Sequence, residues 1–351
     1  MGGSTSITDF RDGVQILDAT LRDGSYVNDF NFTAAQTKTI CRALEAAGID
    51  LIEVGHGAGI GAGRSPAFES AAESDEDYMI AAAEACTEAN WGMFCFPGLG
   101  SPDGIRLAAS HGADFVRVGC HVTEVESAEE YINAAQEAGM FVSANMVKTN
   151  AVSPSKFAAK VQTAEEYGAD MASIVDSAGG LVPEDVRRYV QEATSRCDLP
   201  IGFHGHDNLG LAAANCVAAV KAGAAVVDTS LQGYGRSGGN APTETTVAAL
   251  EKAGFDVSAN VPELLRVGHK HVGPLRDNGG WDPLDIAGGY ADVHSEHIPV
   301  ILEYAREYDV DPALLMREVS KHDKVYAPPD LVEELAESLN AEDGGSVADY
   351  Q

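Results

Sequence analysis

Short apolar runs recur along the chain, and each is followed by a longer segment with helical spacing. The runs are four to six residues long and rich in apolar and β-branched residues, which is typical of buried strands. Eight strands are predicted in this way, at residues 14–18, 50–55, 92–96, 114–119, 141–146, 171–175, 201–204 and 226–231.

The segments between the predicted strands carry the punctuation of helices. Ser, Thr or Pro stands near their starts and Gly near several of their ends, as in residues 33–48, 153–168 and 183–196. Alternating strands and helices predict a parallel sheet, and eight such units within about 240 residues favour a closed (β/α)8 TIM barrel over an open doubly wound sheet. In such a barrel, the chemistry lies at the C-terminal ends of the strands and in the loops that follow.

The rest of the chain predicts a second, helical domain. The predicted barrel takes residues 1–253, and residues 254–340 are expected to be mostly helical, with helices at 261–272, after Val293, at 312–319 and at 329–339. Residues 341–351 are acidic and Gly-rich and are expected to form a flexible end.

The charge balance narrows the classes of partner. The chain has 351 residues, with 23 Lys and Arg against 54 Asp and Glu, a formal charge of −31, and 45% of its residues are hydrophobic. That apolar content supports a large core, so the acidity does not signal disorder. A polyanion repels phosphate backbones and anionic lipid headgroups, so we expect neither nucleic acid nor membrane as a partner. Because the acid is spread along the whole chain, we interpret it as adaptation to a salt-rich cytoplasm; the alternative is an ordinary acidic protein.

We expect neither export nor membrane insertion. Residues 1–10 are polar, without a basic segment followed by an apolar one, and no apolar run reaches the length that spans a bilayer. The six cysteines are scattered and form no C-x-x-C pair. This pattern is typical of buried thiols in a reducing compartment, so we expect a cytoplasmic protein.

The seventh predicted strand ends in a His-Gly-His sequence. Period two places His204 and His206 on the same face, pointing into the barrel mouth, with Gly205 between them leaving room. Two imidazoles one strand step apart, with a carboxylate from elsewhere, make a three-point metal site with open positions for substrate. The alternative is a structural role in the core, which suits a single His better than two in register.

The first predicted strand leads into the sequence DATLRDG at residues 18–24. At such a position Arg22 could supply a fixed cation for a carboxylate substrate, and Asp23 a hard oxygen ligand for a metal. Arg-Asp-Gly is also ordinary turn chemistry, and these residues alone leave both interpretations open.

Two glycine-rich stretches follow predicted strands. Residues 233–244 allow close backbone approach to a ligand, or else form a flexible loop before a helix that starts near Thr243. Residues 55–63 lack the register of a dinucleotide-binding turn and the Lys of a P-loop, so nucleotide binding is rejected there.

Five segments, taken in order, resemble a known family. They are LRDG (21–24), IEVGHG (52–57), DSAG (176–179), HGHDNL (204–209) and GGNAP (238–242). Together they are similar to the pyruvate-dependent 4-hydroxy-2-oxovalerate aldolases, which belong to the barrel metallolyases with the 3-hydroxy-3-methylglutaryl-CoA lyases and isopropylmalate synthases. The resemblance runs from about Gln15 to GYADVHS at 289–295. The H-x-H and LRDG motifs are specific to the superfamily, and EVGHG with G-Y-A-x-V narrows it to the aldolase branch.

The resemblance implies cleavage of a 4-hydroxy-2-oxoacid to pyruvate and an aldehyde, or the reverse reaction, through a metal-stabilised pyruvate enolate. A divalent cation, with manganese expected and magnesium or cobalt as alternatives, would be held by Asp23, His204 and His206 and would chelate the substrate, which His204 also contacts. Arg22 would stabilise the enolate when the C3–C4 bond breaks, and Ser177 would bind the pyruvate carboxylate. Because negative charge develops on the C2 oxygen, a metal and a guanidinium aimed there would favour the transition state.

Two positions depart from the family pattern together. The aldolases have a His two residues after R-D-G, taken as the base for the C4 hydroxyl, where this chain has Tyr26; they have a Tyr in the G-Y-A-x-V-Y segment, where this chain has His294. One hypothesis is that the two side chains meet over the substrate, with His294 as base and Tyr26 orienting the aldehyde, since a neutral imidazole near its ordinary pKa suits proton abstraction at pH 7. The other hypothesis is that the acceptor or leaving group differs and neither residue is catalytic.

The resemblance also bears on partners and on alternative activities. In these aldolases the helical tail helps dock an acylating aldehyde dehydrogenase, so such an enzyme is a candidate partner here, and a homo-oligomer is expected. Claisen chemistry on an acyl-CoA is the alternative activity, although a polyanion is an awkward host for the phosphates of CoA. A non-catalytic scaffold subunit is disfavoured by the intact Asp23, His204 and His206, and a ferrous oxygenase is disfavoured because such sites usually lie in other folds.

Overall fold

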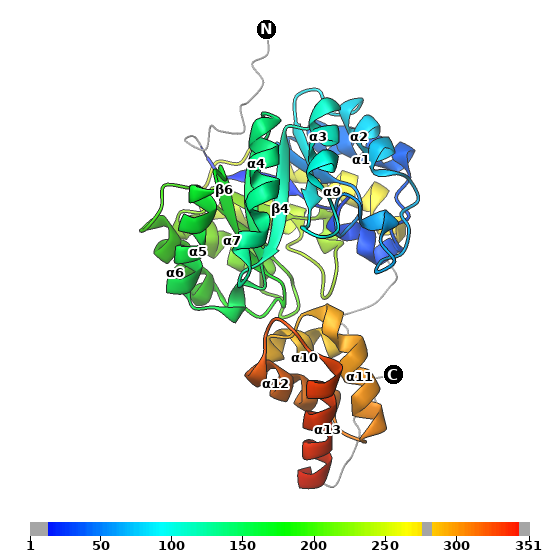
Figure 1. The fold of residues 1–351 in the computed structure, drawn as a ribbon. Helices are drawn as coiled ribbons and strands as arrows, with labels where there is room; N and C mark the ends of the chain where they lie inside the picture. The colour runs from blue at the N-terminus through cyan, green and yellow to red at the C-terminus, as the bar shows by residue number, and fades with distance from the viewer. Residues whose placement is uncertain (1–12, 276–282, 344–351) are drawn as a thin grey trace.

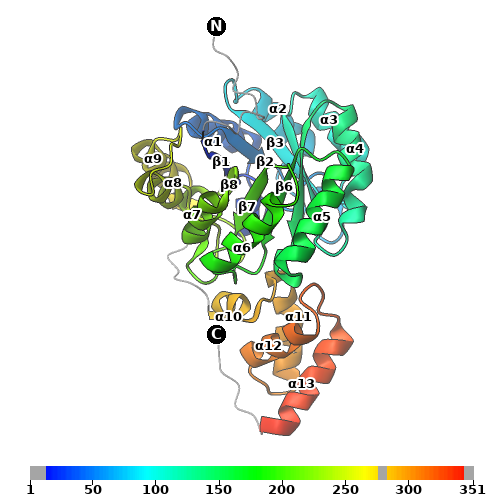
Figure 2. The same cartoon turned by 90° about the vertical axis from the view of Figure 1, so that its left-hand side faces the viewer.

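Eight parallel strands close into a barrel in chain order, with β8 paired to β1 (Figures 1 and 2). The structure is a computed structural model and describes residues 13–275 and 283–343. The predicted (β/α)8 TIM barrel is confirmed, and each predicted strand matches an observed strand to within two residues at either end. The strands are β1 (Gln15–Asp18), β2 (Leu51–Val54), β3 (Asn90–Cys95), β4 (Phe115–His121), β5 (Phe141–Val147), β6 (Met171–Asp176), β7 (Ile201–Gly205) and β8 (Val226–Thr229).

Helices between the strands form the outer layer of the barrel (Figure 2). Their starts follow the sequence: the Thr33 side chain accepts from the Gln36 amide in a capping box, and Ser153 caps a helix with Pro154 in its first turn. The helices are α1 (Ala34–Ala46), α2 (Asp75–Ala83), α3 (Pro102–Ser110), α4 (Glu129–Glu137), α5 (Pro154–Glu166), α6 (Pro183–Thr194), α7 (Ala212–Ala222) and α8 (Thr243–Lys252). Short 3-10 segments are η1 (Asp23–Asn28), η2 (Ala62–Arg64), η3 (Val125–Ala128), η4 (Thr149–Ala151), η5 (Leu231–Gly233), η6 (Gly273–Leu275) and η7 (Ser295–His297).

The inside of the barrel is layered, because side chains two apart along a strand share a face. Buried apolar residues of five strands form one layer: Leu17 of β1, Leu51 of β2, Phe115 of β4, Met171 of β6 and Val226 of β8. Two residues further along β2, β4 and β8, the same inward face carries Glu53, Arg117 and Asp228, all at most 3% exposed. The barrel therefore has an apolar floor and, above it toward the C-terminal ends of the strands, a buried layer of charge.

The C-terminal part of the chain is helical, as predicted, with α9 (Val261–His271), α10 (Pro283–Ala291), α11 (Ile298–Glu307), α12 (Pro312–His322) and α13 (Pro329–Asp343). Leu264 and Val267 of α9 belong to the main core of the barrel, whereas a separate core joins α10 to α13. The predicted domain boundary at residue 253 stays a prediction. Of the predicted flexible end, residues 344–351 lie outside the described residues, and α13 includes 341–343.

Helices α10–α13, here called the tail, lie against one end of the barrel in both views (Figures 1 and 2). This end is the C-terminal one, because Lys148, which follows β5, donates to Glu296 Oε1 and to the Val325 carbonyl of the tail. Tyr326 reinforces the contact through a hydrogen bond to Glu124 and an edge-on ring contact with His121. The tail thus covers the end of the barrel at which TIM-barrel chemistry is found.

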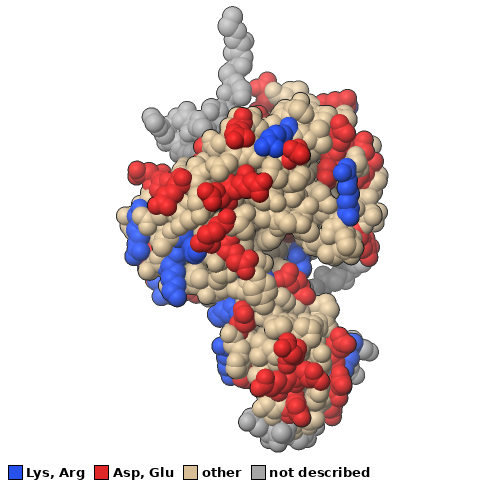
Figure 3. All heavy atoms as spheres, in the orientation of Figure 1, with Lys and Arg blue, Asp and Glu red and all other residues tan. Residues whose placement is uncertain are grey.

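Acidic side chains are spread over both the barrel and the tail on the face shown in Figure 3. Among the described residues, no helix combines the length and apolarity needed to cross a bilayer. The cysteines are all free; Cys41, Cys95, Cys120 and Cys216 are buried, and the other two are partly buried.

Candidate active site

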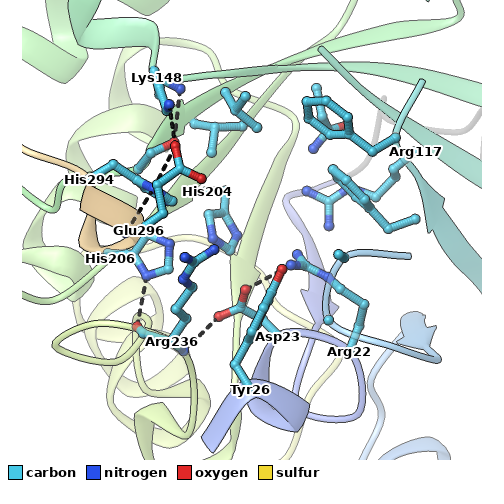
Figure 4. Close-up of a pocket in the computed structure, with 18 of the residues that line it drawn as sticks. Arg22, Asp23, Tyr26, Arg117, Lys148, His204, His206, Arg236, His294 and Glu296 are labelled. Carbon is cyan, nitrogen blue, oxygen red and sulfur yellow. Dashed lines mark hydrogen bonds and ion pairs between the residues drawn. The ribbon is translucent and has the colours of Figure 1, made fainter. Parts of the chain in front are cut away.

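The structure brings all seven predicted site residues to one cavity of about 210 Å³ at the C-terminal end of the barrel (Figure 4). They are Arg22, Asp23, Tyr26, Ser177, His204, His206 and His294. An engineered apolar cavity of about 150 Å³ holds benzene, so this larger space admits a small organic acid. The floor comes from strand ends and the rim from the tail.

Three buried side chains converge on one point of this cavity. Asp23 begins η1 after β1, and His204 and His206 stand at the end of β7; each offers a ligand atom, and these atoms lie within 4.8 Å of one another. All three residues are at most 5% exposed. One carboxylate oxygen and two imidazole nitrogens at this spacing fit a divalent transition metal with open positions.

The Asp23 carboxylate is held in its charged form. Its Oδ1 accepts from Arg22 at 2.7 Å, and its Oδ2 accepts from Asn240 Nδ2 at 2.9 Å and from the Arg236 backbone amide at 3.0 Å. Burial by itself would raise the pKa of Asp23, but the Arg22 charge and the Asn240 hydrogen bond help to lower it well below its usual value. Gly235 makes this support feasible, since a Cβ there would lie 2.5 Å from Asn240 Nδ2 and 2.8 Å from Asp23 Oδ2. The glycine-rich loop after β8 therefore approaches a site residue closely.

Each imidazole is oriented through its Nδ1 atom. His204 Nδ1 lies 2.9 Å from Asp228 Oδ2, and His206 Nδ1 lies 3.1 Å from the Arg236 carbonyl. Both partners are acceptors, so both rings carry their proton on Nδ1 and leave Nε2 with a free lone pair. Burial lowers the pKa of His206 to about 3, which keeps that ring neutral at pH 7.

A buried ion-pair network lies beneath these residues. Glu53 Oε2 accepts from Arg22 Nε at 2.7 Å and from Arg117 at 3.1 Å, and Arg117 also pairs with Asp228. Asp228 in turn orients His204. The network therefore links the guanidinium of Arg22 to an imidazole of the proposed metal site through fixed side chains.

Tyr26 and His294 both line the cavity but differ in their surroundings. The Arg236 guanidinium lies over the Tyr26 ring, 4.7 Å from its centroid, and a Cβ at Gly57 would come within 2.5 Å of the ring. His294 Nδ1 lies 3.4 Å from both the backbone amide and the Oε1 atom of Glu296. Figure 4 shows Tyr26 next to Asp23, the Arg236 side chain extending toward the imidazoles, and His294 beside Glu296.

The expectation that the His294 imidazole keeps its ordinary pKa is wrong. The side chain is 12% exposed, and burial lowers the pKa of His294 to about 4 although the Glu296 carboxylate opposes the shift. Burial likewise raises the pKa of Tyr26 above its usual value. At pH 7 the imidazole is neutral and the phenol keeps its proton, so only His294 of this pair can accept one.

Lys148 lies at the rim, where barrel and tail meet. It has left-handed backbone angles (φ 58°), and its side chain is only 3% exposed. The ammonium group contacts Glu296 and the Val325 carbonyl. Its backbone amide donates to Ser177 Oγ at 2.8 Å, which leaves the Ser177 hydroxyl proton for another acceptor.

Sequence reasoning missed Glu53, Arg117, Asp228, Lys148, Arg236, Asn240 and Glu296 as site residues. A signal existed for the first three, because a charged residue at an inward position of an apolar strand is costly unless it is paired. Lys148 and Glu296 carried no local signal, since their contact spans 148 residues of sequence.

Comparisons with known proteins agree with the resemblance found in the sequence. The HMGL-like family model matches residues 13–270. A 4-hydroxy-2-oxovalerate aldolase from Carboxydothermus hydrogenoformans is 35% identical over 328 residues, covering 93% of this chain and 97% of the relative. One of the same name from Thermus thermophilus is 34% identical over 338 residues, covering 95% and 96%.

Solved structures show the same fold at lower identity. The N-terminal domain of a putative aldolase from Bacteroides vulgatus is 23% identical with a TM-score of 0.71, covering 84% of this chain and 98% of that one. The carboxyl transferase domain of pyruvate carboxylase from Rhizobium etli, with 3-hydroxypyruvate, is 19% identical with a TM-score of 0.76, covering 96% and 62%.

Proposed function

Because this chain belongs to the HMGL-like family and, within it, to the 4-hydroxy-2-oxovalerate aldolases, which are carbon–carbon lyases, we propose that it cleaves a 4-hydroxy-2-oxoacid to pyruvate and an aldehyde, or forms it from them. The observation that carries the proposal is the convergence of Asp23, His204 and His206 beside the Arg22 guanidinium in one buried cavity.

The residues present fit a divalent metal. The carboxylate of Asp23 is ionised, both imidazoles carry free Nε2 lone pairs, and the buried Oδ1 of Asn240 has no hydrogen-bond partner among the described residues. Asp23, His204 and His206 would hold the ion, with Mn²⁺ proposed and Mg²⁺ or Co²⁺ as alternatives for a mixed oxygen and nitrogen site. When bound, such an ion supplies a Lewis acid for the carbonyl of a 2-oxo acid.

Arg22 supplies fixed positive charge for the reaction. Its guanidinium is buried between Asp23 and Glu53, so it needs no reorganisation when negative charge develops on the C2 oxygen of the substrate during C3–C4 cleavage. Ser177 is proposed to donate its hydroxyl proton to the pyruvate carboxylate, because the backbone amide of Lys148 already occupies an acceptor site of its oxygen. His204 would also contact the substrate at its pyruvate end.

For the proton of the C4 hydroxyl, we propose His294 as the acceptor and Tyr26 as the group that orients the aldehyde end. The backbone amide of Glu296 donates to His294 Nδ1 at 3.4 Å, and the charged Oε1 atom of Glu296 lies at the same distance from that nitrogen. For the acceptor role we propose that the carboxylate becomes the partner of Nδ1, which places the proton on Nδ1. In that tautomer Nε2 is free to take a proton. The Tyr26 hydroxyl, protonated at pH 7, can donate to the aldehyde oxygen.

The tail is proposed as the docking surface for an acylating aldehyde dehydrogenase, in a homo-oligomer within the cytoplasm. Supporting features are the position of the tail at the cavity rim and exposed apolar side chains such as Leu314, which is 40% exposed. Co-purification of such a dehydrogenase, and light scattering for the oligomer, test these points.

The decisive experiment measures two reactions on metal-loaded protein. Exchange of the pyruvate methyl protons with deuterium, followed by NMR without aldehyde, reports enolisation; incubation with pyruvate and a panel of aldehydes, followed by mass spectrometry, reports carbon–carbon bond formation. Both are expected to need the metal and to be independent of CoA. Activity only with an acyl-CoA would replace the proposal with Claisen chemistry, and absence of both reactions would leave a non-catalytic subunit.

A further inference from the structure

Four basic side chains line the cavity, and carboxylates pair with three of them. Arg22 pairs with Asp23 and Glu53, Arg117 with Glu53 and Asp228, and Lys148 with Glu296. The guanidinium of Arg236 has no carboxylate within 4.0 Å among the residues that the structure describes. An unneutralised guanidinium inside a cavity of a strongly acidic protein is a site for an anion from solution.

Arg236 is fixed at both of its backbone polar groups. Its amide donates to Asp23 Oδ2 at 3.0 Å, and its carbonyl lies 3.1 Å from His206 Nδ1. The backbone therefore supports two proposed metal ligands, while the side chain extends along the Tyr26 ring into the cavity (Figure 4). The aromatic face stabilises the cation and leaves the in-plane N–H groups of the guanidinium available as donors.

The position of Arg236 points to the aldehyde end of the substrate rather than to the keto acid end. Its guanidinium covers Tyr26, which the proposed function assigns to the aldehyde, and its charge also acts on His294. The proposed function assigns the pyruvate end to Arg22 and Ser177. Tyr26 is also one of the two positions at which the sequence departs from the family pattern. The guanidinium of Arg236, which pairs with no carboxylate among the described residues, therefore lies directly against a residue that differs from the family.

We propose, as an inference that rests on the proposed function, that the aldehyde substrate carries a terminal carboxylate and that the Arg236 guanidinium binds it. A planar guanidinium matches a carboxylate in a bidentate pair, so recognition would combine charge with geometry. The aldehyde would then be a short semialdehyde acid, since the cavity of about 210 Å³ must also hold pyruvate.

Binding of two matched acids tests the proposal without turnover. 2-Oxoheptanedioate has a distal carboxylate and 2-oxoheptanoate lacks it; neither has the 4-hydroxyl group, so neither can undergo retro-aldol cleavage. By calorimetry on the metal-loaded protein, we expect the dioate to bind at least about 10-fold more tightly, and Arg236→Met to bring the ratio of the two affinities close to 1. Arg236→Lys should retain part of the preference.

The matched control is Arg106→Met, an arginine of α3 that is 49% exposed and pairs with Asp103 outside the cavity. It should show the wild-type ratio. In the aldol direction, the wild-type protein should react faster with succinic semialdehyde than with pentanal. An equal or better rate with glyceraldehyde 3-phosphate would show that Arg236 binds a phosphate group, and would overturn the proposal that the aldehyde carries a carboxylate.

Equal weakening of both acids by Arg236→Met would also overturn the proposal, because Arg236 would then serve the keto acid end. Deuterium exchange of pyruvate separates this failure from that of the proposed function. Normal exchange without a preference for the dioate rejects only the carboxylate-bearing aldehyde, whereas a preference without exchange supports Arg236 as an anion site and rejects the aldolase.

Discussion

Arg22 and Asp23, adjacent in sequence, form a buried ion pair in which Arg22 Nη1 lies 2.7 Å from Asp23 Oδ1. The turn into η1 directs both side chains into the cavity, so one residue supplies the cation and the other the proposed metal ligand. The pair also lowers the pKa of Asp23, which keeps a ligand charged despite its burial.

Asp23→Asn should abolish the metal site while keeping the shape of the side chain. Loss of the anionic ligand is expected to weaken Mn²⁺ binding by more than about 100-fold, since even changes to outer partners of ligands cost about 10- to 100-fold. Calorimetric titration with Mn²⁺ measures the change. Asp29→Asn, at an exposed position just after η1, is the control and should bind Mn²⁺ as the wild type does; unchanged affinity in Asp23→Asn would exclude Asp23 as a ligand.

His294→Asn should separate the two halves of the reaction. If His294 accepts the C4 hydroxyl proton, its loss should lower kcat for cleavage by about 10²- to 10⁴-fold and slow deuterium exchange of pyruvate far less, because exchange does not involve C4. Tyr26→Phe should have the smaller effect on cleavage. His111→Asn, at the C-terminal end of α3 and outside the cavity, is the control. Near-normal cleavage in His294→Asn with abolished cleavage in Tyr26→Phe would reverse the two roles.

Burial of His294 should also appear in the pH dependence of stability. Its pKa is lowered to about 4 in the folded protein, so the unfolded chain binds the extra proton first as the pH falls below the ordinary value of 6.5. The stabilisation is present above pH 6.5 and is lost as the pH falls toward 4. Between these values the wild type should lose about 3 kcal/mol relative to His294→Asn, measured by urea unfolding of metal-free protein. A difference that stays constant with pH would contradict a buried neutral imidazole.

Lys148→Met should loosen the tail from the barrel. The substitution leaves Glu296 and the Val325 carbonyl without their shared donor, and we expect a loss of about 2 kcal/mol in the free energy of unfolding. Hydrogen exchange of α11 and α12 should rise. Lys156→Met, on the exposed face of α5, is the matched control. Unchanged exchange in the tail would show that apolar packing alone holds it.

Salt should stabilise the protein if its acidity is an adaptation. With a formal charge of −31, raising KCl from about 0.1 to 2 M should screen self-repulsion and raise Tm, because the Debye length falls from about 10 Å to below 3 Å. A Tm and activity that are highest in dilute buffer would identify an ordinary acidic protein.

The sequence by itself determined the barrel and two of the residues that we propose as metal ligands. Alternating apolar runs and capped helices can be identified locally, and period two along a strand places His204 and His206 on one face whatever surrounds them. The resemblance then paired them with Asp23, which the structure places within reach.

Only the tertiary structure decided how charge is arranged around that site. Lys148 meets Glu296 because the tail folds back over the barrel, and Arg236 lies over Tyr26 because the loop after β8 returns to η1. The physical reason is that a side chain's partners at long sequence separation depend on how elements pack, and a local pattern of apolar and polar residues carries no record of that packing. The burial that lowers the pKa of His294 is of the same kind, since it is produced by neighbours from distant segments.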